Sequence, residues 1–132
     1  MELYTDGSHK NGLGSWAYVI VKKGMTTAEV SGVERKTSSL KMEIKAAIEA
    51  LRGISEGTQA TVFSDCRILI DVMTVKNKKT GTSPVADLYD TLFSLAERRK
   101  VNWSWVRAHS GVSYNERCDQ LCLNARIKRL AK

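Results

Sequence analysis

Four acidic residues lie at the ends of predicted strands or beside the apolar side of predicted helices, and these are not the positions expected for acids that only face solvent. Asp6 and Asp65 each follow a short strand-forming run. Glu43 and Asp119 each lie beside the apolar stripe of a predicted helix. Functional groups in a mixed α/β sheet gather at strand ends, where loops converge. We therefore expect the four carboxylates to meet at one place.

Carboxylates that meet repel one another, and bound divalent cations offset this repulsion best, because carboxylate oxygen suits hard Mg²⁺. Two such ions about 4 Å apart can activate a water and stabilise the leaving oxygen of a phosphodiester. The cluster therefore favours a metal-dependent phosphodiesterase. Each acid also has an ordinary interpretation when taken singly. Asp6 suits a turn and Asp65 a helix N-cap, whereas Glu43 and Asp119 suit a solvent-facing helix surface.

The charge balance points to the class of partner. The chain has 21 Lys and Arg against 14 Asp and Glu, a net charge of +7. This charge indicates either a protein that binds a polyanion, most commonly nucleic acid, or one that simply has a solvated basic surface. Two basic groups are candidates for phosphate contacts: Lys76, Lys78 and Lys79, and a tail with Arg126, Lys128, Arg129 and Lys132.

Length and composition limit the class of protein. The 132 residues suit a single domain over 1–132. Cys66, Cys118 and Cys122 are odd in number and have no C-x-x-C spacing, which argues against a disulfide framework or a zinc site and fits reduced thiols in the cytoplasm. The N-terminus does not resemble a signal peptide, and no apolar run approaches the roughly 20 residues of a membrane span.

The hydrophobic periodicity predicts alternating strands and helices. The order is β-β-β-α-β-α-α-β-α, which indicates a mixed sheet with helices on its faces. Trp103 and Trp105 share one face of the last strand, so we expect them in the core, with stacking on bases as the alternative. The predicted strands are 2–5, 15–22, 25–34, 59–64 and 101–106, the helices 39–53, 66–75, 85–99 and 114–128, and the main loops 8–14, 76–83 and 107–113.

Five segments together resemble type 1 ribonuclease H, including the RNase H domains of retroviral reverse transcriptases. The segment 105–111 (Trp-Val-Arg-Ala-His-Ser-Gly) is the most specific of them. The others are Tyr-Thr-Asp-Gly-Ser at 4–8, Lys-Met-Glu-Ile-Lys-Ala-Ala at 41–47, Ser-Asp at 64–65 and Asn-Glu-Arg-Cys-Asp-Gln-Leu at 115–121.

This resemblance implies the RNase H fold, a five-stranded mixed sheet whose first three strands are antiparallel. It also implies that Asp6, Glu43, Asp65 and Asp119 hold two Mg²⁺ ions, with Mn²⁺ as a substitute. The implied reaction is cleavage of RNA within an RNA–DNA hybrid, leaving 3′-hydroxyl and 5′-phosphate ends. His109 matches a loop histidine of the family, for which a proton-transfer or product-release role is expected and a structural hydrogen bond is the alternative.

Substrate recognition is expected from polar groups near the acids, because the 2′-hydroxyl distinguishes RNA from DNA. Asn115 matches a substrate-facing family position, although it could equally cap the last helix. The other candidates are Gly7, Ser8, Asn11, Ser39, Arg67, Lys76, Lys78 and Lys79. Ser39 and Arg67 stand where many family members have other residues, and the basic segment around the three lysines is shorter than in larger bacterial relatives.

Three alternatives remain beside a free-standing, monomeric nuclease. A non-catalytic nucleic-acid-binding module could use the same fold, since folds host many functions. Such a binder would be expected to have lost an acid, and all four are present. A polynucleotidyl transferase would have a different acid spacing and no Trp-Val-x-Ala-His-x-Gly segment. A detached reverse-transcriptase domain is disfavoured by the compact ends of the chain.

Overall fold

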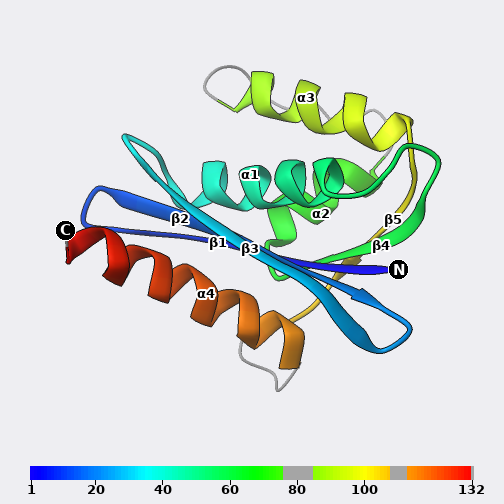
Figure 1. Ribbon diagram of the computed structural model, residues 1–132. Helices are drawn as coiled ribbons and strands as arrows, with labels where there is room; N and C mark the ends of the chain where they lie inside the picture. Colours follow the sequence, from blue (N-terminus) through cyan, green and yellow to red (C-terminus); the bar gives the residue numbers. More distant parts are fainter. Residues whose placement is uncertain (76–84, 108–112, 132) are drawn as a thin grey trace.

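The computed structural model describes residues 1–75, 85–107 and 113–131. Five strands and four helices follow one another in the predicted order (Figure 1). They are β1 (Glu2–Lys10), β2 (Leu13–Lys22), β3 (Met25–Arg35), α1 (Ser39–Arg52), β4 (Gln59–Ser64), α2 (Arg67–Thr74), α3 (Ala86–Glu97), β5 (Lys100–Trp105) and α4 (Ser113–Leu130).

All strands join one sheet in the order β3-β2-β1-β4-β5. β1, β2 and β3 are antiparallel, whereas β4 runs parallel to β1 and β5 parallel to β4. The predicted α/β fold class, with its mixed sheet and antiparallel first three strands, is therefore confirmed. Helices α1, α2 and α3 cover one face of the sheet and α4 covers the other (Figure 1).

The first strand differs from the prediction. The sequence predicts a strand that ends before Asp6 and a loop over 8–14, and both predictions are wrong. β1 continues to Lys10 and pairs with β2 along its whole length, so Asp6 lies in the middle of a strand. The turn is limited to Asn11 and Gly12, whose φ angles of 53° and 78° suit a two-residue hairpin turn. The other predicted ends differ from the observed ones by no more than two residues.

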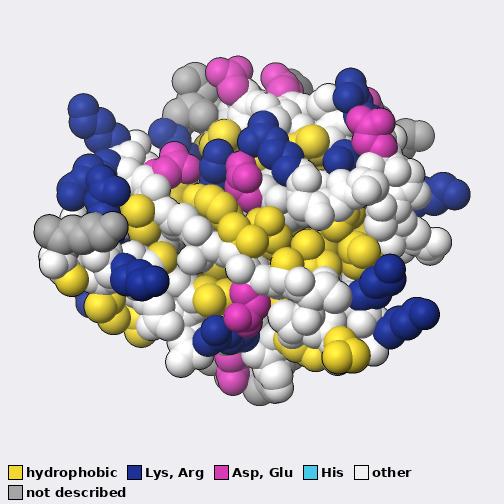
Figure 2. Space-filling model, viewed as in Figure 1, with side chains coloured by type: hydrophobic (Ala, Val, Ile, Leu, Met, Phe, Trp, Pro, Cys, Tyr) yellow, Lys and Arg dark blue, Asp and Glu magenta, His cyan; other side chains and the backbone are white. Residues whose placement is uncertain are grey.

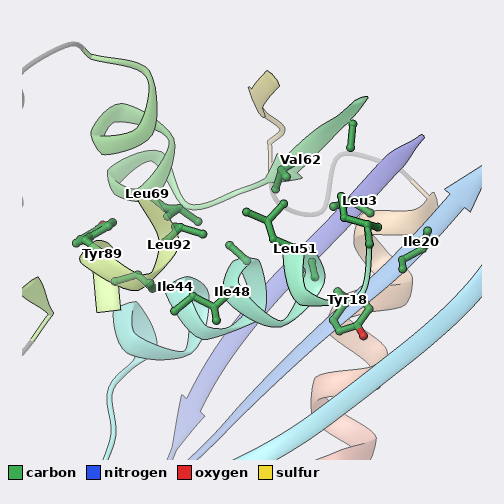
Figure 3. Packing of buried hydrophobic residues seen from close by; sticks show 14 of the residues in the cluster. Leu3, Tyr18, Ile20, Ile44, Ile48, Leu51, Val62, Leu69, Tyr89 and Leu92 are labelled. Atoms are coloured by element: carbon green, nitrogen blue, oxygen red, sulfur yellow. The ribbon is translucent and has the colours of Figure 1, made fainter. Parts of the chain in front are cut away.

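Helix α1 forms the centre of the larger hydrophobic core. Its N-terminus is capped by Ser38, whose Oγ accepts the backbone N–H of Lys41 at 3.2 Å. Ile44, Ile48 and Leu51 recur at helical spacing and are at most 2% exposed. They pack against residues of β1, β4, α2 and α3, as Figure 3 shows.

A smaller cluster lies under α4, where Cys118 and Cys122 pack on Tyr4, Val19 and other residues of β1 and β2. The tryptophan prediction is half right. Trp103 is partly buried against the larger core, but Trp105 is 38% exposed and lies outside it.

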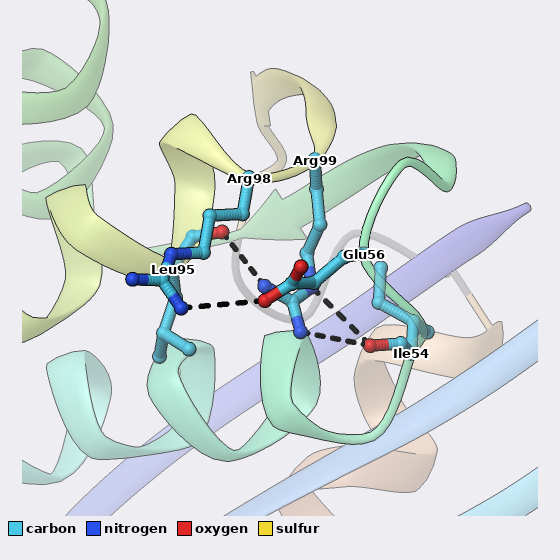
Figure 4. Close-up of polar contacts among 5 residues, drawn as sticks. All are labelled: Ile54, Glu56, Leu95, Arg98 and Arg99. Carbon is cyan, nitrogen blue, oxygen red and sulfur yellow. Dashed lines mark hydrogen bonds and ion pairs between the residues drawn. The ribbon is translucent and has the colours of Figure 1, made fainter.

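The end of α3 is joined to the loop after α1 by an arginine (Figure 4). Arg99 donates from Nε and Nη2 to the carbonyl oxygen of Ile54, at 3.2 and 3.0 Å, and from Nη1 to that of Leu95 at 2.9 Å. Arg98 forms an exposed ion pair with Glu56 at 3.3 Å. These contacts fix α3 over α1 at the end of the sheet remote from residues 5–10 of β1.

On the face in Figure 2, Lys and Arg side chains are spread widely and do not form a single patch. Within the described residues, no helix is long and apolar enough to cross a membrane.

Candidate active site

The unequal lengths of two neighbouring strands create the site. β4 pairs with β1 only as far as Tyr4 opposite Phe63. Asp6 stands two residues beyond that pair on β1, and Asp65 follows directly after the last residue of β4. The two carboxylates therefore meet where β1 loses its neighbour, as expected for groups gathered at a strand end.

Gly7 brings the third acid to this place. A Cβ built on Gly7 would lie 2.3 Å from the backbone nitrogen of Glu43 and 2.3 Å from the carbonyl carbon of Met42. Only a glycine permits such a close approach of α1 to β1. The backbone N–H of Gly7 also hydrogen-bonds the carboxylates of both Asp6 and Glu43. Gly7 therefore acts through its missing side chain and through its N–H, which donates to both carboxylates.

The carboxylates form a compact group. One oxygen each from Asp6, Glu43 and Asp65 lies within 4.8 Å of the others. Asp119, on α4, interacts with the Asp6 carboxylate through a side-chain hydrogen bond. The structure thus brings together all four acids that the sequence singles out, from β1, α1, the end of β4 and α4.

Burial makes this group unfavourable without a positive charge. Desolvation, followed by the charges of Asp65 and Asp119, raises the pKa of Asp6 to about 8. Desolvation, followed by the charges of Asp6 and Asp65, raises the pKa of Glu43 well above its usual value. Oε1 of Glu43 is buried and has no hydrogen-bond partner among the described residues. The clustered carboxylate oxygens are hard ligands, and one of them has no hydrogen-bond partner among the described residues. Such a group fits a divalent cation.

The backbone of Asp65 is held by Trp105, a role that the sequence did not indicate. The indole Nε1 of Trp105 donates to the backbone carbonyl of Asp65 at 3.1 Å. The guanidinium of Arg67 lies 4.3 Å from the centre of the Trp105 ring, a cation–π contact. The exposed indole thus fixes the backbone of a site residue, which explains why Trp105 is absent from the core.

Two thiols support β1, one at Asp6 itself and one two residues before it. Cys118 donates to the carbonyl oxygen of Tyr4 at 3.2 Å, and Cys122 donates to that of Asp6 at 3.5 Å. Burial raises the pKa of both thiols, so they remain protonated donors. The sequence does not indicate that Cys118 and Cys122 contact the strand that carries Asp6.

The other predicted substrate residues have varied positions. Ser8 accepts a hydrogen bond from Nη1 of Arg126 at 2.5 Å, and Ser39 is exposed at the start of α1. Asn11 lies in the turn at the far end of the β1–β2 hairpin, away from Asp6 along the strand. His109, Lys76, Lys78 and Lys79 lie outside the described residues.

Asn115 is 3% exposed and is the third residue of α4, so its alternative role as the N-cap is wrong. Its Oδ1 is buried without a hydrogen-bond partner in the described part of the chain. It stands one helical turn before Asp119 and therefore on the same side of α4.

Comparison with known proteins agrees with this geometry. A family model described as RNase H matches residues 1–127. A ribonuclease H of Caldanaerobacter subterraneus is 36% identical over 134 residues, covering 92% of this chain and 87% of the relative. A ribonuclease H of Campylobacter jejuni is 33% identical over 136 residues, covering 97% and 92%.

Two solved structures share the fold. LC11-RNase H1, crystallised in complex with an RNA/DNA hybrid, has a TM-score of 0.83 at 19% identity, and 98% of each chain is covered. The N-terminal RNase H domain of a Mycobacterium tuberculosis protein has a TM-score of 0.82 at 18% identity, with 99% of each covered. The matches extend over nearly the whole sequence, and the chain belongs to the ribonuclease H family of hydrolases.

Proposed function

We propose that this protein hydrolyses the RNA strand of RNA–DNA hybrids with two bound Mg²⁺ ions, leaving 5′-phosphate and 3′-hydroxyl ends. The observation that carries the proposal is the group of three carboxylates within 4.8 Å, two of them sharing the N–H of Gly7. The net charge of +7 suits a polyanionic substrate, and a relative in fold is known in complex with a hybrid.

Asp6, Glu43, Asp65 and Asp119 would hold the ions, with Mn²⁺ as a substitute for Mg²⁺. When bound, the metal supplies Lewis acidity and an activated water at the scissile phosphate. The chain itself supplies orientation. The N–H of Gly7 fixes the carboxylates of Asp6 and Glu43, and Trp105 fixes the backbone at Asp65.

For substrate contacts, we retain the candidates from the sequence. Asn115 has an unused acceptor close to Asp119 in α4, which supports a role in recognising a 2′-hydroxyl after local rearrangement. For His109 we propose proton transfer during leaving-group departure. His109→Ala is then expected to slow turnover without abolishing it, and an unchanged rate would remove His109 from the mechanism.

The reaction can be tested by comparing four substrates under identical conditions: RNA–DNA hybrid, RNA duplex, single-stranded RNA and DNA. We expect cleavage of the RNA in the hybrid alone, with 5′-phosphate ends, in Mg²⁺ or Mn²⁺. Chelation with EDTA should stop it. If the protein binds the hybrid without cutting it under any of these conditions, it is a binding module on the same fold.

We also propose that the protein works as a monomer in the cytoplasm. Its three free thiols, two of them buried, suit a reducing compartment. Sedimentation and cell fractionation test the two statements separately.

A further inference from the structure

Helix α4 carries a second apolar stripe that the sheet does not cover. Leu123, Ile127 and Leu130 follow one another at i, i+4 and i+7, so they share one side of the helix. They are 48%, 55% and 71% exposed. Single exposed apolar residues are ordinary, but a contiguous exposed row indicates an interaction site.

This stripe borders a hollow between the last turns of α4 and the β1–β2 hairpin. The hollow has a volume of about 290 Å³. Leu13, almost fully buried at the start of β2, continues its apolar lining. In Figure 2, apolar and basic side chains alternate around the end of the chain at the left. The space suits apolar side chains entering from another molecule.

The charged groups of the hollow are all of one sign. Among the described residues of its lining, the charged ones are Lys10 and Arg126, and both are cations. Nη1 of Arg126 donates to the hydroxyls of Ser8 and Ser15, at 2.5 and 2.9 Å. These neutral hydroxyls fix the guanidinium without compensating its charge, so the hollow favours an anionic partner.

The surroundings argue against two other occupants. A second copy of the chain, packed by two-fold symmetry, would bring the same cations of both copies together, and each copy carries +7. A flat bilayer surface would reach the exposed stripe but not the concave lining formed with Leu13. An extended or helical peptide can place side chains into the hollow and carboxylates beside it.

We propose that this hollow binds an acidic segment of a partner protein, with apolar side chains against Leu13 and Ile127 and carboxylates at Lys10 and Arg126. The proposal goes beyond the nuclease activity and does not depend on it. Ser8, which holds Arg126, stands two residues after Asp6 on β1. The hollow itself lies at the turn of the β1–β2 hairpin, farther along β1, so a partner bound here would not occupy the acid cluster.

The test uses a fluorescein-labelled octapeptide of alternating leucine and aspartate, titrated with the full chain and followed by fluorescence anisotropy. We expect saturable binding with a dissociation constant on the order of 10 μM to 100 μM. Ile127→Ser and Lys10→Glu should each weaken it about tenfold. Ile68→Ser is the matched control, because Ile68 on α2 is 58% exposed against 55% for Ile127. Thermal melts should show that all three variants fold.

Each other result overturns the proposal. Equal binding of a peptide with lysine for aspartate, or with serine for leucine, would exclude combined charge and apolar recognition. A dimer in sedimentation that Ile127→Ser abolishes would assign the stripe to a second copy. Competition by phosphatidylserine vesicles, or loss of hybrid affinity in Ile127→Ser, would assign it to lipid or nucleic acid. No saturation up to about 1 mM peptide would leave no site.

Discussion

Neighbouring residues of α1 take part in two buried clusters with opposite energetic character. Ile44 belongs to the aliphatic core between α1, α2, α3 and the sheet, where burial of apolar surface stabilises the fold. Glu43 points its carboxylate into the acid cluster, where burial and like charges raise its pKa and oppose folding in the ionised form. The larger core offsets the cost of the site beside it. Stability and chemistry thus depend on different faces of one helix, and substitutions can separate them.

The largest effect is expected in the acid cluster. Asp65→Asn removes a negative ligand while keeping nearly the same shape, so hybrid cleavage in Mg²⁺ should fall by at least about 10³-fold with the fold intact. Cleavage rates and circular dichroism check this together. Near-normal turnover in a folded variant would refute the metal-site assignment.

The complementary change lies in the core. Leu51→Ala leaves a cavity at a fully buried position of α1 and should lower the free energy of unfolding by about 2–5 kcal/mol. Urea denaturation measures the loss. Cleavage well below the melting temperature should remain close to that of the original protein, and a selective loss of activity would mean that the two clusters are not separable.

The acid cluster should also give an unusual pH dependence. The folded-state pKa of Asp6 is raised to about 8 from 3.8, so the folded state holds more protons than the unfolded state between these values. Without metal, stability should therefore fall as the pH rises from about 4 to 8. Asp6→Asn removes this contribution and should stabilise the metal-free protein at pH 8 by on the order of 1–2 kcal/mol.

Urea denaturation in EDTA at pH 5 and pH 8 measures this effect, and adding Mg²⁺ at pH 8 should stabilise the original protein more than the variant. An identical pH slope in both proteins would show that the Asp6 carboxylate is not under electrostatic strain.

A smaller effect is expected at the support of Asp65. Trp105→Phe keeps an aromatic ring beneath Arg67 but removes the indole N–H that holds the Asp65 carbonyl. Loss of one hydrogen bond of about 1 kcal/mol should weaken Mg²⁺ binding roughly fivefold, measured by calorimetry. Trp103→Phe, on the same strand, is the control and should alter stability but not Mg²⁺ affinity.

Much of the fold follows from local patterns. The period of Ile44, Ile48 and Leu51 predicts α1, and the apolar run before Asp65 predicts β4, because each pattern matches one secondary structure. The error in β1 came from the polar residues after Asp6. The Asn11-Gly12 pair is a strong signal for a two-residue hairpin turn. Placing the turn there predicts that β1 continues up to Asn11, as the structure shows.

The positions of the four acids at one site were predictable from residue type, place along the elements and family resemblance. The supports of the site were not. Trp105 contacts the guanidinium of Arg67, which belongs to another element, and the thiol contacts of Cys118 and Cys122 depend on how α4 crosses β1. Such contacts arise from tertiary packing, which hydrophobic periodicity does not specify.

The early end of β4 has a consequence for solubility. A strand without a neighbour on one side presents backbone groups that can recruit a strand from another molecule and begin aggregation. On β1 this stretch starts after Tyr4. Helix α1 lies against β1 at Gly7, and the carboxyl side chains of the site flank the same stretch of β1. The groups that build the site therefore also hinder a strand of another molecule from pairing with β1.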